Sequence, residues 1–410
     1  MALSSTEKRS AFYNFSNRVW QRWKTPLLIF AVFRLALFIF PFISLESLPL
    51  NYLDDRYKGI GFGYWEERLA GTWLRFDANW YLDIAEKGYY NEPQTAFFPL
   101  FPLLIKFLGI ALGGNYGIAA LVISNLSTLA VFILLYEIAH HEYQNEQIAR
   151  NTLLFIATYP TAFYFLAAYT ESLFMALTLG ALLAMRRYRN WAIAAGLGAL
   201  ATLTRNIGVL LVVPLLWEWW QANRLQKLNH RIVAQVLFLF LPVLALAGHI
   251  LALWSITGSL TTLLEAQSRW GRHFSLPWDT LVNSLKIIID RPPHGVMAEE
   301  IPTPILELEL FFFIANLIFF MAVCYYGRKG KILLSYILFD GLAILVPLLS
   351  AASYEPLMSF PRFSLVLFPS FFALAHLTVR HPGLRLCYFV FSVLLFSLMC
   401  ACYFARLWIG

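Results

Sequence analysis

Long apolar runs separated by short polar and basic segments dominate the 410-residue chain. A helix needs about 20 predominantly apolar residues to cross a bilayer. Runs near that length occupy residues 26–45, 117–139, 150–169, 232–256, 305–326, 332–350, 363–379 and 385–407. Shorter or interrupted runs occupy residues 97–113, 171–185, 191–203 and 207–220. This pattern predicts an all-α polytopic membrane protein, a bundle of roughly ten to twelve transmembrane helices.

Basic residues cluster between the apolar runs, which predicts the orientation of the chain. They lie in the N-terminal tail and in the segments 186–189, 224–231, 327–331 and 380–385. The positive-inside rule places such segments in the cytoplasm. From residue 186 onward the basic segments and the apolar runs are consistent with one orientation. It places the segments 204–206, 257–304 and 353–362 outside. Between residues 97 and 185, four full crossings would put the segment 186–189 outside. One of these runs must therefore be re-entrant or interfacial, and the sequence does not decide which.

Two long polar stretches, 46–96 and 257–304, share the external side in this arrangement. Long loops in a compact bundle are often functional. In the first, residues 65–69 and 82–87 are amphipathic enough to form short interfacial helices. We expect a cytoplasmic tail over residues 1–25, without a cleavable signal peptide, and a single membrane domain over 26–410.

Composition supports the membrane assignment and excludes other classes. Hydrophobic residues make up 59% of the chain and charged residues only 13%, whereas soluble domains carry about 25% charged residues. The net charge of +7 comes from the basic loops, and no basic stripe interleaves with aromatic residues, so nucleic-acid binding is not expected. The four cysteines lie inside apolar runs without zinc-ligand spacing and are interpreted as packing residues.

The most informative motif spans residues 75–89, RFDANWYLDIAEKGY, and is followed by AFFPLFPLL at 96–104. Asp77 lies among aromatic residues at the predicted external boundary of the membrane. A partly desolvated carboxylate in this position suits general-base chemistry on a hydroxyl. Aspartate is also a common N-cap for a following helix. Sequence chemistry alone leaves both roles open.

This stretch resembles the signature of the PIG-V family, the second mannosyltransferase of GPI-anchor assembly, and its bacterial relatives. Three further blocks agree in order: YPT at 159–161 with YTESLF at 169–174, TRNIG at 204–208, and SFPRF at 359–363. Two blocks depart from the family pattern. Phe76-Asp77 replaces Trp-Asp, and the sequence after Arg205 differs from Arg-Ser-Asn-Gly, which makes Asn206 a weaker candidate than Arg205.

The resemblance implies a GT-C-type membrane glycosyltransferase that takes sugar from a polyprenyl-phosphate carrier, with Asp77 as the catalytic base. Arg205 interrupts the apolar stretch 191–220, and an ionisable residue there is a functional candidate. Its guanidinium could bind a lipid phosphate or could serve helix packing. Arg362 has the same two interpretations, with an interfacial anchor as the alternative. The expected substrate-binding residues are Arg205, Arg362, Glu171, Asn206, Tyr169, Trp80 and Tyr81.

Other polar residues are weaker candidates for a functional role. Glu171 could bind sugar hydroxyls or could favour a helix N-terminus. His140 and His141 are adjacent and do not share a helix face, and the pair at 54–55 is interpreted as solvated loop. We therefore expect no metal site and no cofactor. Asp83 has no counterpart in the family pattern, and Asp340 lies within an apolar run without an evident partner.

The leading hypothesis is an inverting hexosyltransferase, with mannose as the expected sugar, acting on a hydroxyl of a lipid- or glycan-linked acceptor outside the membrane. Its partners would be the lipid donor, the acceptor and membrane lipid, and an accessory subunit is compatible with the sequence. The alternatives are a transporter or flippase, which would favour inverted repeats that are not seen here, and a non-catalytic subunit of a glycosylation complex. The short tail and compact loops favour a bacterial inner membrane, or the endoplasmic reticulum for a eukaryotic chain.

Overall fold

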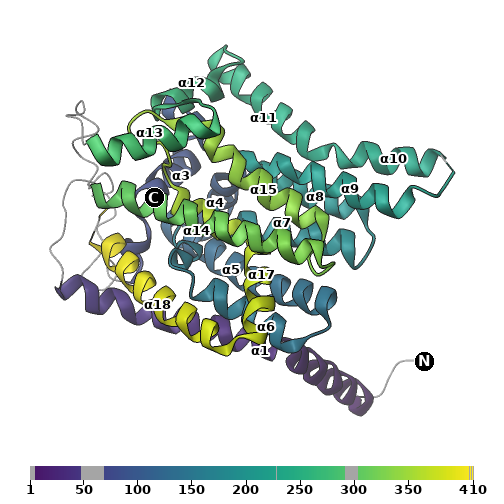
Figure 1. The fold of residues 1–410 in the computed structure, drawn as a ribbon. Coiled ribbons are helices and arrows are strands. Elements are labelled where there is room, and N and C mark those ends of the chain that lie inside the picture. Colours follow the sequence, from purple (N-terminus) through teal and green to yellow (C-terminus); the bar gives the residue numbers. More distant parts are fainter. Residues whose placement is uncertain are drawn as a thin grey trace.

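The computed structural model describes residues 5–47, 69–227, 229–290, 303–405, 407 and 409, and almost all of them are helical (Figure 1). The first half of the chain forms α1 (Ser5–Ser47), α3 (Asp77–Lys87), α4 (Leu100–Ala111), α5 (Tyr116–Tyr143), α6 (Glu146–Ala157), α7 (Glu171–Arg186), α8 (Trp191–Thr202) and α9 (Val212–Asn223). Short 3-10 turns, among them η4 (Ala162–Phe165) and η5 (Asn206–Leu211), join them. The pair at 54–55 and most of the predicted helix 65–69 lie outside the described residues.

The second half contains one small β-ribbon among its helices. Its helices are α10 (His230–Leu239), α11 (Leu241–Thr257), α12 (Thr262–Arg269), α13 (Pro277–Asp290), α14 (Thr303–Arg328), α15 (Leu334–Leu349), α16 (Phe360–Phe363), α17 (Phe368–Arg380) and α18 (Pro382–Phe404). Strands β1 (Arg272–Phe274) and β2 (Ser350–Ala352) pair antiparallel, with Arg272 opposite Ala352. The ribbon ties the loop after α12 to the end of α15.

Several helices are long and apolar enough to cross a membrane. Among the described residues these are Trp20–Pro41, Tyr116–Tyr143, Pro304–Arg328 and Pro382–Phe404. Two bent pairs, Ile232–Leu239 with Leu241–Thr257 and Phe360–Val366 with Phe368–Arg380, bring the number to six if each is one span. The polytopic helical class is confirmed. Length and composition give fewer spans than the ten to twelve expected, because apolar runs such as 97–113, 191–203 and 332–350 form shorter helices.

The helix ends that carry basic residues meet at one end of the molecule. Arg22 of α1 and Arg187, just after α7, both pair with Glu137 of α5. Arg186 donates to Glu218 of α9 at 2.8 Å. Buried or half-buried charges need such partners, since an unpaired charge loses its hydration without compensation. Arg22 and the first residues of the basic segment 186–189 therefore lie at the same end of the bundle.

Helix α4 is the best candidate for the run that did not fit the predicted orientation. It has 12 residues, about 18 Å of helix, whereas the hydrocarbon core is about 30 Å thick. The residues before it, Phe97 and Phe98, and those after it, Gly113 and Gly114, line the same cavity. Both flanks of α4 thus lie at one cavity, which favours α4 as the re-entrant run.

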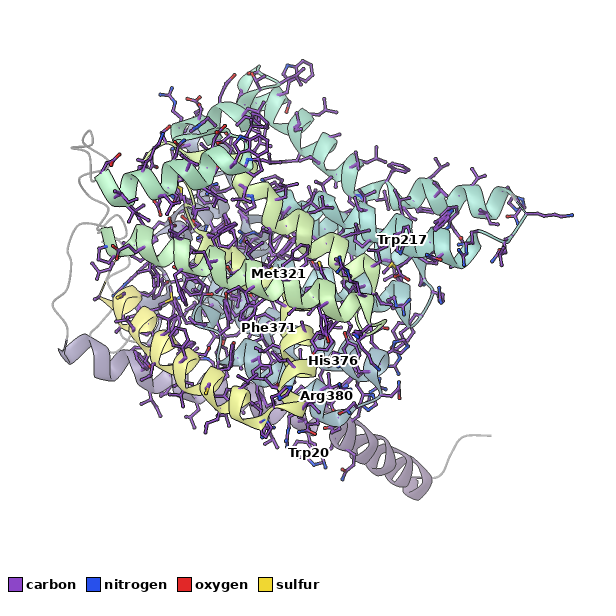
Figure 2. The ribbon with its side chains drawn as sticks, in the orientation of Figure 1. Trp20, Trp217, Met321, Phe371, His376 and Arg380 are labelled. Carbon is purple, nitrogen blue, oxygen red and sulfur yellow. The ribbon has the colours of Figure 1, made fainter. Side chains whose placement is uncertain are left out.

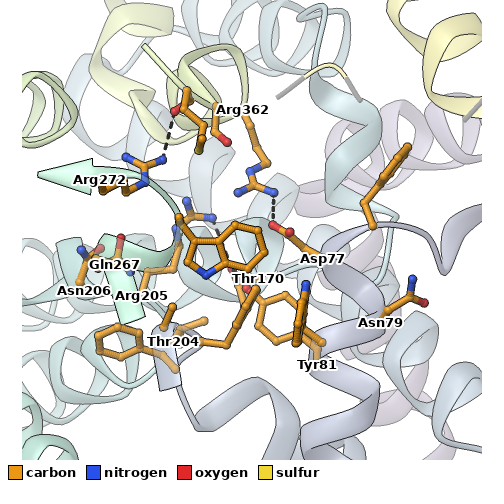
Figure 3. A pocket seen from close by; sticks show the side chains of 18 of the residues that line it. Asp77, Asn79, Tyr81, Thr170, Thr204, Arg205, Asn206, Gln267, Arg272 and Arg362 are labelled. Carbon is orange, nitrogen blue, oxygen red and sulfur yellow. Dashed lines mark hydrogen bonds and ion pairs between the residues drawn. The ribbon is translucent and has the colours of Figure 1, made fainter. Parts of the chain in front are cut away.

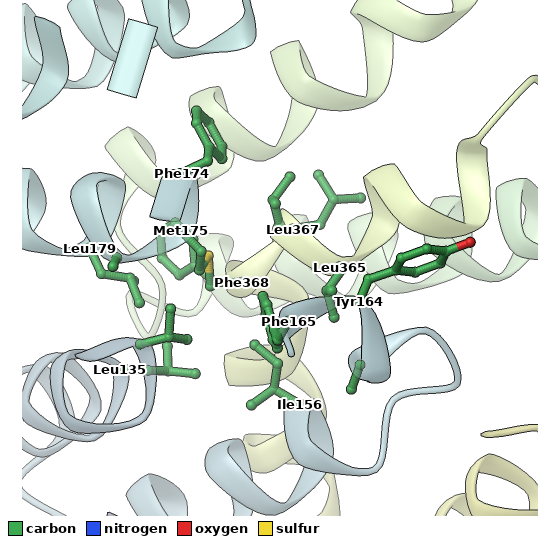
Figure 4. Close-up of a cluster of buried hydrophobic side chains, with 14 of the residues drawn as sticks. Leu135, Ile156, Tyr164, Phe165, Phe174, Met175, Leu179, Leu365, Leu367 and Phe368 are labelled. Atoms are coloured by element: carbon green, nitrogen blue, oxygen red, sulfur yellow. The ribbon is translucent and has the colours of Figure 1, made fainter. Parts of the chain in front are cut away.

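The core lies where α5, α6, α7 and the 364–372 segment meet (Figure 4). Phe165, Phe174 and Phe368 are fully buried there. Outer helices instead expose apolar side chains, as at Met321 of α14, which is 57% exposed (Figure 2). Apolar surface of this kind is stable against lipid rather than water.

Candidate functional site

A cavity of about 1810 Å³ opens at the end of the bundle opposite the basic loops. Its wall comes from segments that are far apart in sequence: α3 and the residue before it, both flanks of α4, the segment 204–207 at the start of η5, α12 with β1, and the stretch from 343 to 366. All four sequence blocks that carry the family resemblance meet at this cavity or directly behind it. The polar residues of its floor are drawn in Figure 3.

Asp77 is the first residue of α3 and projects into the cavity. The residue before it, Phe76, has a positive φ of 54°, an unfavourable conformation for a bulky side chain, and the chain turns sharply there. The N-cap is Phe76, so the interpretation of Asp77 as the N-cap is wrong. Its Oδ2 instead accepts a hydrogen bond from Arg362 at 2.5 Å (Figure 3). The Asp77 side chain is 16% exposed, and no described residue hydrogen-bonds its second oxygen.

Four side chains of alternating charge form a chain of ion pairs, here called the charged cluster: Asp77, Arg362, Glu171 and Arg205. Arg362 Nε lies 3.2 Å from Glu171 Oε1, and Arg205 pairs with the same oxygen. Glu171, the first residue of α7, is only 1% exposed. Buried charges are tolerated when each has opposite partners. The cluster therefore joins α3, α7, α16 and the break between α8 and η5 into one polar floor.

Arg205 and Arg362 were each expected either to bind phosphate or to serve the fold, and the structure excludes one of the structural alternatives. Arg362 is 8% exposed, so it is not an interfacial anchor at the lipid surface. It lies in the short helix α16, with its guanidinium 5.4 Å from the ring centre of Tyr169. Arg205 follows α8 in extended conformation and donates to Thr170 Oγ1 at 3.3 Å. Both arginines line the cavity, and both already have carboxylate partners.

The remaining predicted residues surround the cluster at different depths. Tyr81 and Trp80 of α3 line the cavity, and the Trp80 ring stacks on Phe97 with centroids 5.8 Å apart. Asn206 also lines the cavity and is exposed. Tyr169 lies behind the wall, where its hydroxyl donates to the Arg75 carbonyl at 3.1 Å. Tyr169 therefore supports Asp77 through the backbone rather than facing the cavity.

Two charged residues of the cavity were missed from the sequence. Arg272 lies in β1 and is half-buried. Glu355 lies in the loop before α16 and is 1% exposed. Burial raises the pKa of the Glu355 carboxyl and lowers that of the Arg272 guanidinium, which Arg362 lowers further. The only sequence signal for Arg272 was a basic residue on the side where the positive-inside rule expects few.

Polar residues that were weaker functional candidates in the sequence have structural roles. Asp83 accepts hydrogen bonds from Lys87 at 2.8 Å and from Gln94 at 2.7 Å. Asp340, which had no evident partner, accepts one from Ser370 at 3.3 Å. His141 lies 3.7 Å from Glu142, near the basic end. Among the residues that the structure describes, no group of three or more His, Cys, Asp or Glu side chains is arranged to hold a metal ion.

The fold and the cavity define a multi-pass helical membrane protein with a charged site on one side. A family model described as Mannosyltransferase (PIG-V) matches residues 28–261, more than half of the chain, and the chain belongs to this family. Asp77, Glu171 and Arg205 lie inside the matched range, whereas Arg272, Glu355 and Arg362 lie beyond it.

Individual relatives match over shorter stretches. GPI mannosyltransferase 2 of Schizosaccharomyces pombe is 31% identical over 144 residues, covering 34% of this chain and 30% of the relative. The Yarrowia lipolytica protein of the same name is 28% identical over 164 residues, covering 40% and 44%. GPI alpha-1,6-mannosyltransferase 2 of Rattus norvegicus is 34% identical over 156 residues, covering 36% and 31%. The matched stretch spans less than half the length of each of these relatives.

Solved structures with a similar arrangement include the oligosaccharyltransferase of Archaeoglobus fulgidus tethered with an acceptor peptide. It shares 11% sequence identity at a TM-score of 0.45, covering 93% of this chain and 56% of that one.

Proposed function

We propose that this protein transfers a hexose, with mannose as the first candidate, from a polyprenyl-phosphate carrier to a hydroxyl of a lipid- or glycan-linked acceptor on the external side of the membrane. Family membership supports a mannosyltransferase. The observation that carries the proposal is the charged cluster, in which a carboxylate and two guanidinium groups face one large cavity. A bacterial inner membrane remains the preferred location, with the endoplasmic reticulum as the eukaryotic counterpart.

The proposed reaction is a single displacement with inversion. Asp77 takes the proton of the acceptor hydroxyl through its free oxygen, and the acceptor oxygen attacks the anomeric carbon. The bond between that carbon and the phosphate oxygen breaks on the opposite face, and the lipid phosphate leaves as an anion. General-base assistance is worth about a hundredfold to ten-thousandfold in rate. Guanidinium groups bind phosphate oxygens in bidentate fashion and stabilise the charge that develops there.

The wall of the cavity suits two different substrates. Residues of α15 and its surroundings, Ala343, Val346, Pro347 and Phe363, give one part an apolar lining, which fits a lipid carrier entering from the bilayer. Around α3 the lining combines the polar side chains of Asn79 and Asp83 with aromatic rings such as that of Trp80, which fits a hydroxylated acceptor. Asp77 lies between the two parts. The phosphate is handled by side chains in this mechanism, so we propose that no cofactor or metal takes part.

The purified protein with a mannosyl polyprenyl phosphate and a hydroxylated acceptor lipid tests the proposal. We expect Asp77→Asn to lower turnover by about a hundredfold or more while the protein still binds the donor. Asparagine keeps the size of the side chain and a hydrogen-bond acceptor for Arg362, but it cannot take the acceptor's proton.

The matched control is Asp279→Asn, the same change at an exposed position on α13. Turnover of this control should equal that of the unchanged protein. Near-normal turnover by Asp77→Asn would show that Asp77 is not the base. Absence of sugar transfer by the unchanged protein, together with movement of the lipid-linked sugar across vesicles, would favour a transporter instead.

A further inference from the structure

Three arginines gather around one aromatic ring in the cavity, and only two of them are paired with carboxylates. The guanidinium carbons of Arg205, Arg272 and Arg362 lie 5.2, 5.7 and 5.7 Å from the ring centre of Phe363. Figure 3 shows all three at the same part of the cavity. Three like charges so close to one ring repel each other unless anions lie among them.

The anions of the charged cluster compensate two of these three charges. Asp77 pairs with Arg362, and Glu171 pairs with both Arg362 and Arg205. No described carboxylate lies within 4.0 Å of Arg272. Glu355 makes no ion pair with Arg272, and burial raises the pKa of its carboxyl. The charge of Arg272 is therefore the least compensated of the three.

Arg272 is held in place by backbone carbonyls, which leaves part of its donor fork available. Its Nη1 donates to the Ser350 carbonyl at 3.0 Å and its Nη2 to the Met358 carbonyl at 3.2 Å. A guanidinium has five N–H donors in a fixed plane, so three remain. Arg272 of β1 lies opposite Ala352 of β2 in the β-ribbon. This pairing fixes the backbone position from which the Arg272 side chain extends.

We propose that Arg272 is the principal ligand of the donor's phosphate, in place of Arg205, and that Arg205 and Arg362 mainly orient the two carboxylates. This inference rests on the proposed function, because it assigns the phosphate of a lipid-linked sugar to the cavity. An anion beside Arg272 would neutralise its charge without breaking an existing ion pair. An anion beside Arg205 would lie close to the carboxylate of Glu171, which is almost fully buried and pairs with the same guanidinium, and would be repelled by it. Arg272 thereby distinguishes a charged lipid phosphate from the free polyprenol.

The test compares the affinities of the full-length protein in detergent for a polyprenyl phosphate, the matching neutral polyprenol and inorganic phosphate. The unchanged protein should prefer the polyprenyl phosphate over the other two. Arg272→Gln should reduce the preference for polyprenyl phosphate over polyprenol by about tenfold or more, as expected for loss of a charged hydrogen bond. A merely structural role would weaken both lipids equally and leave the preference unchanged, which would overturn the proposal.

Arg269→Gln is the matched control, since Arg269 lies three residues away and pairs on the exposed surface with Glu92. It should change the preference less than twofold. If Arg272→Gln does not fold, Arg272→Lys decides the matter: a threefold or larger loss of preference supports the proposal, and an unchanged preference overturns it.

Two further results separate this inference from the proposed function. A protein that binds neither lipid would count against the lipid donor, and hence against both. Equal affinity for inorganic phosphate and polyprenyl phosphate would show a site for the free ion, which overturns the assignment of Arg272 to the donor lipid.

Discussion

Beside the equally buried Glu309, Glu355 shows how burial of a carboxyl couples stability to pH. The side chain is 1% exposed, and burial raises the pKa of its carboxyl above the ordinary value of 4.5. The folded protein then holds this proton more tightly than the unfolded chain does. The free energy of unfolding therefore falls as pH rises above about 4.5, by up to about 1.4 kcal/mol per pH unit until the folded-state pKa is reached.

Glu355→Gln removes this titration, because glutamine keeps the shape of the protonated acid. We expect the variant to match the unchanged protein in thermal unfolding near pH 4.5 and to be the more stable of the two at pH 8. Thermal unfolding of both proteins in detergent across this range measures the difference. A difference that does not grow with pH would mean that Glu355 is ionised throughout.

Individual residues of the site were predictable to different degrees. Asp77, Arg205 and Arg362 each stand out locally, as charges among aromatic or apolar neighbours. Their mutual pairing was not predictable, because Asp77 and Arg362 are 285 positions apart and only the fold brings them together. Arg272 falls within the predicted external stretch 257–304 without a local signal of its own, and its proposed role follows from the paired state of the other two arginines.

At the scale of elements, the break between α8 and η5 holds Arg205 in place through a close backbone contact. A Cβ on Gly208 would lie 2.4 Å from the Thr202 nitrogen and 2.5 Å from the Ala201 carbonyl carbon. Backbone atoms cannot move aside as a flexible side chain can. The 3-10 turn η5 can therefore pack against α8 only if residue 208 is glycine.

Gly208→Ala should push η5 away from α8 and move Arg205, which lies three residues earlier. We expect a loss of about 1–3 kcal/mol, the usual cost of overpacking, together with weaker donor binding. Gly196→Ala is the control within α8, where no atom lies within 4 Å of the added Cβ; it should be neutral or stabilising by up to about 1 kcal/mol. Equal unfolding temperatures for the two variants would contradict the close contact.

Hydrophobicity predicted most of these elements but not how each one crosses. Helix α5 and helix α14 follow the predicted runs 117–139 and 305–326 within a few residues at each end. The run 97–113 is as apolar as its neighbours, yet it forms a helix of only 12 residues, α4, whose two flanks line one cavity. An apolar run shows that a segment avoids water, whereas its crossing depends on where its ends are held, as by the bond from Leu100 N–H to the Leu203 carbonyl.

On the scale of the whole molecule, charge is divided between two ends. The charged cluster and the cavity lie at one end, and the pairs that Arg22, Arg186 and Arg187 make with glutamates lie at the other. The layers between them are mainly apolar, as lipid requires. This division suits the proposed function, in which a hydroxylated acceptor and a membrane-embedded lipid meet at one site.

The orientation of these two ends can be measured on either side of α14. Asp279 lies before this helix, in α13 near the cavity, and Lys329 follows it at the basic end, and both are exposed. In a background without the four native cysteines, a membrane-impermeant maleimide should label Asp279→Cys in intact cells. It should label Lys329→Cys only after permeabilisation, because basic loops are retained in the cytoplasm. The reverse pattern would place the cavity in the cytoplasm, and labelling of both residues from one side would show that α14 does not cross.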